Sequence, residues 1–217
     1  MTFSRLHITV FLGLAVLVWG LVLLVDGTPI GKEHLAPFGI VVSFLVLMGI
    51  AFEHVLWRSP WLHGWFVERP DLRGTWRVEL KSDWADPQTG KAAAMRVCYM
   101  GVEQTLSKLQ MHLMTSESES WSIAADILPS PSGRGYQVAG VYTNRPQVHL
   151  RGNRSEIHYG TLVLDTHGSA ARPDTLTGEF WTDRKTSGRT DFTNRISKIA
   201  TRFDEAERLF AAENLQE

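Results

Sequence analysis

Two long apolar runs stand near the N-terminus, and the rest of the sequence has a different pattern. The first run, 6–25, has only His7 and Thr9 as clearly polar residues, both near its beginning. The second run, 37–57, follows after a short polar loop, and both runs are apolar on every helical face. A helix of this length spans about 30 Å, the thickness of the hydrocarbon core of a bilayer. We therefore expect two transmembrane helices.

A cleaved signal peptide is the alternative for the first run. Its apolar core is too long for a signal peptide, no small-residue cleavage site follows, and a second apolar run comes soon after. The loop between the runs has no net positive charge, whereas arginines flank the pair at Arg5, Arg58, Arg69 and Arg73. Because positive residues stay on the cytoplasmic side, we expect both termini in the cytoplasm.

From residue 70 onward, short alternating segments are separated by turn residues. Such alternation predicts strands that bury one face. Eight segments fit, with no helix between them: 74–80, 95–102, 105–115, 121–127, 136–143, 156–165, 176–184 and 190–196. This pattern is typical of an antiparallel sandwich or an up-and-down barrel. A closed barrel of about eight strands can hold one small ligand.

The tail, 197–217, has the pattern of an amphipathic helix. Its apolar residues recur at three- and four-residue steps, at Ile199, Phe203, Ala206 and Phe210. We expect this helix to pack on the strand domain; pairing with another chain or lying on the membrane are the alternatives.

Composition and motifs exclude several classes of protein. The formal net charge of −1 argues against a polyanionic partner such as DNA or RNA. The single cysteine, Cys98, allows no intrachain disulfide, which suits a reducing compartment. The sequence has no zinc spacing, P-loop, dinucleotide fingerprint or nucleophile elbow. We therefore predict no catalytic residue, metal or cofactor, and a protein that is not an enzyme.

Arg184 is the first candidate for a ligand contact. It shares strand parity with Leu176 and Phe180, which is the apolar and inward face. We expect it to point into the barrel or its mouth, and an arginine on that face, unless it lies at the rim, needs an anion or a carboxylate partner. The alternative is an ion pair within the fold, with Glu179, Asp183 or Asp191 as partner.

Hydroxyl groups and aromatic rings complete the candidate set. Thr182 and Thr115 also have core-facing parity, and the run 115–120, which includes Ser118, offers hydroxyls suited to phosphate or ribose. Aromatic platforms on which a base could stack are Trp76, Tyr142 and Trp84.

Seven stretches, in their order and spacing, resemble a known family. They are 70–76, 82–84, 104–105, 115–120, 142–146, 158–162 and 176–188. Over roughly 6–196 the chain resembles the CBASS antiphage effectors with two transmembrane helices and a β-barrel sensor, called CD-NTase-associated protein fifteen. The tail lies beyond this pattern. Phe180-Trp181 departs from it, because a polar or small residue is expected second.

The resemblance implies a membrane-anchored all-β protein of the bacterial inner membrane. Two N-terminal transmembrane helices would precede an approximately eight-stranded antiparallel β-barrel at 70–196 and a C-terminal amphipathic helix. It implies that a cyclic dinucleotide enters the barrel, that the chains associate as a homo-oligomer, and that their helices disrupt the bilayer and kill the infected cell. The expected ligand-binding residues are Arg184, Thr182, Thr115, Ser118, Tyr142, Trp76, His158 and Gln104.

Three other functions remain possible on the sequence. A lipocalin-like barrel would bind an apolar ligand, against which the inward parity of Arg184 argues. A tethered hydrolase needs an activated nucleophile, and the sequence indicates no residue for that role. A scaffold would recruit a protein partner through its barrel or tail.

Overall fold

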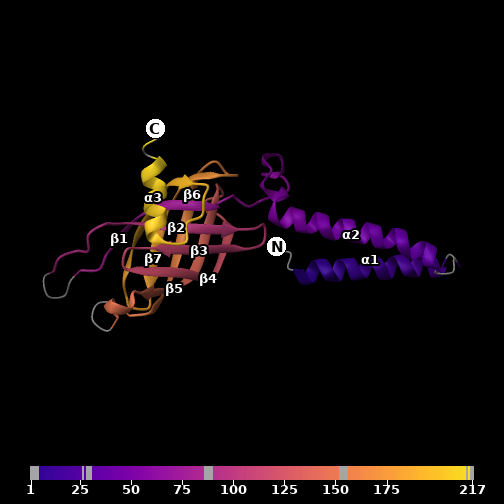
Figure 1. Cartoon of the computed structure of the whole chain (residues 1–217), viewed down its shortest axis with the longest axis horizontal. Helices are drawn as coiled ribbons and strands as arrows, with labels where there is room; N and C mark the ends of the chain where they lie inside the picture. The colour runs from indigo at the N-terminus through magenta and orange to yellow at the C-terminus, as the bar shows by residue number, and fades with distance from the viewer. Residues whose placement is uncertain are drawn as a thin grey trace. The chain divides into compact units, whose positions relative to one another are not determined.

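The computed structural model describes residues 5–25, 27, 31–85, 90–151, 156–213 and 215 (Figure 1). The chain divides into two compact units. One consists of Met1–Ser59 with Thr105–Ser107, and the other of Pro60–Gln104 with Lys108–Glu217.

The first unit contains two long helices, α1 (Arg5–Val25) and α2 (Lys32–His54). Helix α2 begins five residues earlier than predicted, because its first turn is polar and an apolar run does not mark it. It ends where Val55 leaves the helical region, at φ −130° and ψ −55°. Short 3-10 turns follow at Leu56–Arg58 and, in the second unit, Pro60–Leu62. Among the described residues, no helix combines the length and the apolar content that crossing a membrane requires.

The second unit is a closed, antiparallel barrel of eight strands, in which each strand pairs with the next and β8 pairs with β1. The strands are β1 (Gly74–Ser82), β2 (Arg96–Gln104), β3 (Leu109–Met114), β4 (Ser118–Pro129), β5 (Tyr136–Pro146), β6 (His158–Gly168), β7 (Pro173–Thr182) and β8 (Ser187–Ile196). The eight predicted strands are confirmed, and of the two predicted architectures the barrel is the correct one. The third strand starts later than predicted, because the chain turns before Leu109.

Alternating side chains fill the barrel, as the pattern predicted. Trp76 and Val78 on β1 are fully buried, as is Leu164 on β6. Leu72, which precedes β1, is 1% exposed and belongs to the same core. The segment that leads into β1 therefore closes one end of the barrel, which we call the closed end.

Helix α3 (Phe203–Glu213) packs on the outside of the barrel, as predicted for the tail. Its Phe210 stacks on Tyr99 of β2 with ring centroids 5.1 Å apart, and Ala206 is fully buried beside them. The Thr75 hydroxyl donates to the carbonyl of Lys198 at 2.7 Å and accepts from the Ala200 N–H at 2.8 Å. These contacts fix the start of the tail against β1.

Candidate ligand-binding site

The end of the barrel opposite the closed end is open, and we call it the mouth. All four turns at this end (β1–β2, β3–β4, β5–β6 and β7–β8) contribute to a cavity of about 700 Å³. This volume lies within the range of about 300–1,000 Å³ that is typical of small-molecule sites. Its charged and imidazole side chains are Lys91, Arg96, Glu117, His158 and Arg184, and its hydroxyls belong to Ser82, Thr115, Ser118, Ser120, Tyr142, Thr182 and Thr186.

Six of the eight predicted ligand residues line this mouth: Thr115, Ser118, Tyr142, His158, Thr182 and Arg184. They come from four strands (β4, β5, β6 and β7) and two turns (β3–β4 and β7–β8), and barrel closure brings them together. That they contact a ligand stays a prediction. Trp84, predicted as an aromatic platform, also lines the mouth.

Arg184 reaches the mouth by a route that differs from the predicted one. Strand β7 ends at Thr182, and the chain reverses in a tight turn in which Lys185 has φ 60°. The Lys185 N–H donates to the Thr182 carbonyl at 3.1 Å. Arg184 lies in this turn and is exposed. Arg184 therefore lies at the mouth, as predicted, but at its rim and in a turn, because strand parity does not extend through the turn.

Two aromatic rings form the floor of the mouth, Tyr142 from β5 and Phe180 from β7. Each ring lies over a glycine of the next strand. A Cβ atom at Gly160 would lie 2.3 Å from Cζ of Tyr142, and one at Gly188 would lie 2.7 Å from Cε1 of Phe180. Burial raises the pKa of Tyr142 to about 12, with a smaller contribution from Asp183. The phenol is therefore neutral at physiological pH.

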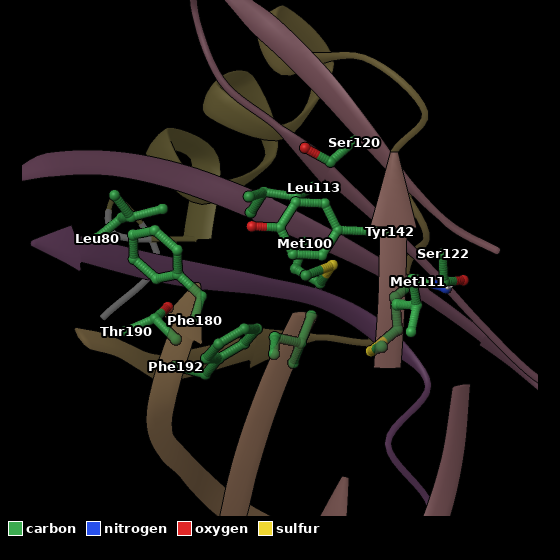
Figure 2. A pocket seen from close by; sticks show the side chains of 12 residues that line it. Leu80, Met100, Met111, Leu113, Ser120, Ser122, Tyr142, Phe180, Thr190 and Phe192 are labelled. Carbon is green, nitrogen blue, oxygen red and sulfur yellow. Dashed lines mark hydrogen bonds between the residues drawn. The ribbon is translucent and has the colours of Figure 1, made fainter. Parts of the chain in front are cut away.

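Beneath this floor is a second, mostly apolar cavity of about 40 Å³ (Figure 2). Met100, Met111 and Phe192 line it together with the two floor rings. It has room for little more than a water molecule. The mouth above it is therefore the only one of these two cavities that is large enough for a nucleotide-sized ligand.

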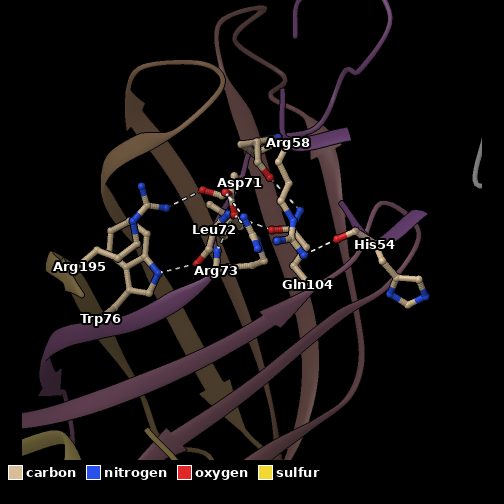
Figure 3. Close-up of polar contacts among 9 residues, drawn as sticks. His54, Arg58, Asp71, Leu72, Arg73, Trp76, Gln104 and Arg195 are labelled. Atoms are coloured by element: carbon tan, nitrogen blue, oxygen red, sulfur yellow. Dashed lines mark hydrogen bonds and ion pairs between the residues drawn. The ribbon is translucent and has the colours of Figure 1, made fainter. Parts of the chain in front are cut away.

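Trp76 and Gln104, the other two predicted ligand residues, are not among the residues that line the mouth. The Gln104 amide is used at the closed end (Figure 3): its Oε1 accepts from the Leu72 N–H at 2.9 Å, and its Nε2 donates to the Pro70 carbonyl at 2.8 Å. The Trp76 indole N–H donates to the Leu72 carbonyl, and Arg195 lies over the ring at 4.7 Å from its centroid. The predicted inward face of Trp76 was correct, but parity does not say at which end of a strand a residue lies. Gln104 lies between two of the predicted strands, and only the family resemblance indicated it as a ligand residue.

An ion pair reinforces the same closed end. The Arg73 guanidinium contacts Asp71 through two hydrogen bonds, of 2.9 Å and 2.7 Å. Burial alone would raise the pKa of Asp71, but hydrogen bonds from the Arg73 side chain and backbone outweigh it, and the pKa is lowered. The Asp71 carbonyl also accepts from Arg195. These contacts hold the segment before β1 in place, so its polar residues stabilise the fold at the closed end.

The mouth carries an excess of positive charge. Three of its described lining residues are cationic (Lys91, Arg96 and Arg184) and one, Glu117, is a carboxylate, which leaves two positive charges. Arg96 contacts Glu117 at 2.8 Å. Burial lowers the pKa of His158, and the Arg184 charge lowers it further, so this imidazole is neutral at pH 7. In the described part of the chain, no group of three potential metal ligands is close enough together to hold an ion.

Several lining residues were missed by the sequence reasoning. Arg96 shares inward parity with Cys98 and Met100 on β2, a signal equal to the one used for Arg184. Asn144 also points inward but carries no charge that would distinguish it, and Ser120 was noted only as one hydroxyl of the run 115–120. Lys91 lies in a loop, where no periodicity indicates direction.

Comparisons with known proteins agree with this geometry. A family model described as the Cap15 cyclic dinucleotide receptor domain matches residues 67–194, which is more than half of the chain and nearly all of the barrel. A curated relative, CD-NTase-associated protein 15 of Yersinia aleksiciae, is 26% identical over 146 residues. That alignment covers 65% of this chain and 65% of the relative, so the chain matches slightly less than two thirds of that protein's length. The chain therefore belongs to the Cap15 family of CBASS-associated proteins, and its barrel is the cyclic dinucleotide receptor domain of that family.

Proposed function

We propose that the mouth binds a cyclic dinucleotide and that the chain is a ligand-sensing membrane effector of CBASS antiphage defence. The observation that carries the proposal is the excess of two positive charges around a cavity of about 700 Å³ with an aromatic floor. A cyclic dinucleotide has two phosphate charges and two bases that can stack. The mouth therefore offers a complementary group for each part of such a ligand.

The polar groups of the mouth form two clusters, which fits the two phosphates. One cluster has Arg96 with hydroxyls from β4 and the β3–β4 turn, and the other has Arg184 with Thr182 and Thr186. In a closed barrel of eight sequential strands, the wall around β3 faces the wall around β7. The clusters thus lie on opposite walls, as the phosphates do on a cyclic dinucleotide ring.

An apolar ligand, the rival for this fold, suits the mouth poorly. Such a ligand would remove water from the charged and hydroxyl side chains that line the mouth, Arg96 and Arg184 among them, and desolvating charged groups is costly. The apolar cavity beneath the floor is too small for a lipid chain. We therefore infer a receptor for a charged nucleotide, without a catalytic role.

The membrane part of the proposal rests on the sequence of α1 and α2. Both helices expose large apolar side chains, for example Leu17 and Leu24 on α1 and Phe44 and Leu47 on α2. The arginine distribution favours a topology with both termini and the barrel in the cytoplasm. We propose that ligand binding promotes association of several chains, and that their helices then disrupt the inner membrane.

Calorimetric titration of the full chain, purified in detergent, tests ligand binding. Cyclic dinucleotides should bind, whereas the corresponding linear dinucleotides, with a freely rotating backbone, should bind at least about tenfold more weakly. A fatty acid serves as the apolar control. Binding of the fatty acid, with none for any cyclic dinucleotide, would refute the proposed ligand class.

Deletion of residues 1–57 tests the membrane part. Cells that express the full chain should stop growing when a cyclic dinucleotide is produced, and cells with the truncated chain should keep growing while the barrel still binds the ligand. Growth arrest by the truncated chain would place the toxic activity in the barrel and contradict a membrane effector.

A further inference from the structure

Asn144 and Ser120 lie directly opposite each other on the paired strands β5 and β4, on the inner wall of the mouth. Asn144 is 9% exposed and Ser120 is 5% exposed, so water reaches little of either side chain. Buried polar atoms are costly unless they form hydrogen bonds. The partners of each atom can therefore be counted one by one.

The amide nitrogen of Asn144 is fully used. It donates to Ser120 Oγ at 2.8 Å and to Ser118 Oγ at 3.0 Å, which accounts for both of its protons. Ser120 accepts one of these and keeps its own hydroxyl proton. Within the described chain, no acceptor takes that proton, and no donor reaches Oδ1 of Asn144.

Ser118 differs from Ser120, because its hydroxyl has a second neighbour in the fold. It lies 3.1 Å from Oγ1 of Thr115, and either oxygen can be the donor of this pair. Thr115 Oγ1 also accepts from the N–H groups of Glu117 and Ser118, so this turn holds Ser118 in place. One free donor, on Ser120, and one free acceptor, on Asn144, thus remain side by side.

This combination does not depend on which way the Asn144 amide faces. If the amide were turned over, Oδ1 would accept from the two serines and the amide nitrogen would point into the mouth. The serine oxygens would then be the free acceptors and the amide the free donor. In both orientations the wall presents a donor beside an acceptor.

We propose that Asn144 and Ser120 recognise the edge of one base of the bound cyclic dinucleotide, so that Asn144 determines which bases are preferred. The inference rests on the proposed function of the mouth. Phosphate oxygens only accept hydrogen bonds, whereas the edges of nucleobases place donors and acceptors next to each other. Tyr142 lies on the same face of β5, two residues before Asn144, and offers its ring for stacking.

Titration of the full chain with cyclic di-GMP, cyclic di-AMP and cyclic di-UMP tests the proposal, because these ligands share their phosphates and differ in their bases. The wild-type chain should prefer one of them. Asn144→Ala should lower the affinity for the preferred ligand by about tenfold or more and change the affinity for each of the other two by less than about twofold. The ratio between the highest affinity and the other two should therefore become smaller. The matched control is Thr143→Ala, on the opposite face of β5, which should leave all three affinities unchanged.

Ser120→Ala provides an independent measurement, because it removes the free donor with a smaller change in packing. If the Asn144 variant unfolds below the assay temperature, the Ser120 variant tests the proposal in its place. We expect the same decrease in the ratio between the highest affinity and the other two. An equal loss for all three ligands, or no loss, would show that the pair only supports the fold. If the wild-type chain binds none of the three, the proposed function fails first, which is a different result.

Discussion

Gly160→Ala tests the architecture of the mouth with a single methyl group. Gly160 on β6 pairs with Tyr142 on β5, and an added Cβ would lie 2.3 Å from Cζ and 2.4 Å from Oη of the phenol. Non-bonded carbon atoms pack at about 3.5–4.0 Å, so the ring must move by about 1 Å or more. The apolar cavity beneath the floor, about 40 Å³, is too small to take it. The ring therefore has to move up into the mouth.

We expect two measurable consequences. The free energy of unfolding should fall by about 1–3 kcal/mol, the usual cost of an extra methyl group in a packed interior. The raised ring should also lose burial, so the pKa of Tyr142 should fall from about 12 towards the ordinary tyrosine value. Thermal unfolding of the unliganded chain measures the first effect, and ultraviolet titration of tyrosinate measures the second. Because the ring then occupies the mouth, ligand affinity should fall as well.

The control is the same substitution in a Tyr142→Ala background. Without the ring, the three atoms nearest to the methyl group are gone, so Gly160→Ala should cost less there. If the substitution destabilises both backgrounds equally and the tyrosine titration is unchanged, the contact between Gly160 and Tyr142 does not set the floor, and the reasoning fails.

Three further substitutions test other parts of the structure. Arg184→Ala should weaken cyclic dinucleotide binding by about 1.5 kcal/mol, the low end of the range for a hydrogen bond to a charged group, because Arg184 is exposed. Calorimetry measures the affinity, and an unchanged value would remove Arg184 from the site. His158→Gln should remove the pH dependence that His158 gives to stability and to ligand affinity. Because the pKa of His158 is lowered in the fold, the stability of the unliganded chain should fall as the pH drops below the ordinary histidine value of about 6.5. Over the same pH range, the affinity for a ligand with two negative charges should rise, because the imidazole becomes positively charged. Unfolding and titration at pH 5.5 and 7.5 check both signs, and identical profiles for wild type and variant would contradict them. Gln104→Ala should cost about 2–4 kcal/mol of stability, because it leaves the buried Leu72 N–H and Pro70 carbonyl unpaired; the exposed Gln110→Ala is its control in thermal unfolding, and an equal effect would show that the Gln104 bonds contribute little.

The strands of the barrel were predictable because each buries one face. Trp76 and Val78 on β1, like Leu162 and Leu164 on β6, alternate with polar residues, and their burial follows that alternation. Closure was not predictable from alternation, since the pairing of β1 with β8 joins residues more than a hundred positions apart. A sandwich would have given the same local pattern.

The site was predictable only in part, for a related reason. Parity assigns a side chain to the inside of the barrel but not to a depth. Trp76 and Ser82 share a face of β1, yet Ser82 lines the mouth and Trp76 is sealed at the closed end. Arg96 and Gln104 divide β2 in the same way. The depth of a residue in the barrel depends on where its strand begins and ends along the barrel. That position is set by the pairing register with the two neighbouring strands.

If the proposed function holds, the mouth separates two tasks by depth. Arg184 is exposed at the rim, where salt screens charges over about 8–10 Å, so we expect it to act on every cyclic dinucleotide alike through phosphate. Asn144 and Ser120 are neutral and nearly inaccessible to water, so we expect their hydrogen bonds to depend on the shape of a base and little on salt. Charged groups at a rim mainly set association rates, whereas unpaired buried polar groups penalise the wrong partner. Raising the salt concentration should therefore weaken the binding of all cyclic dinucleotides and leave the order of their affinities unchanged, because that order depends on hydrogen bonds of neutral, buried groups that salt screens little.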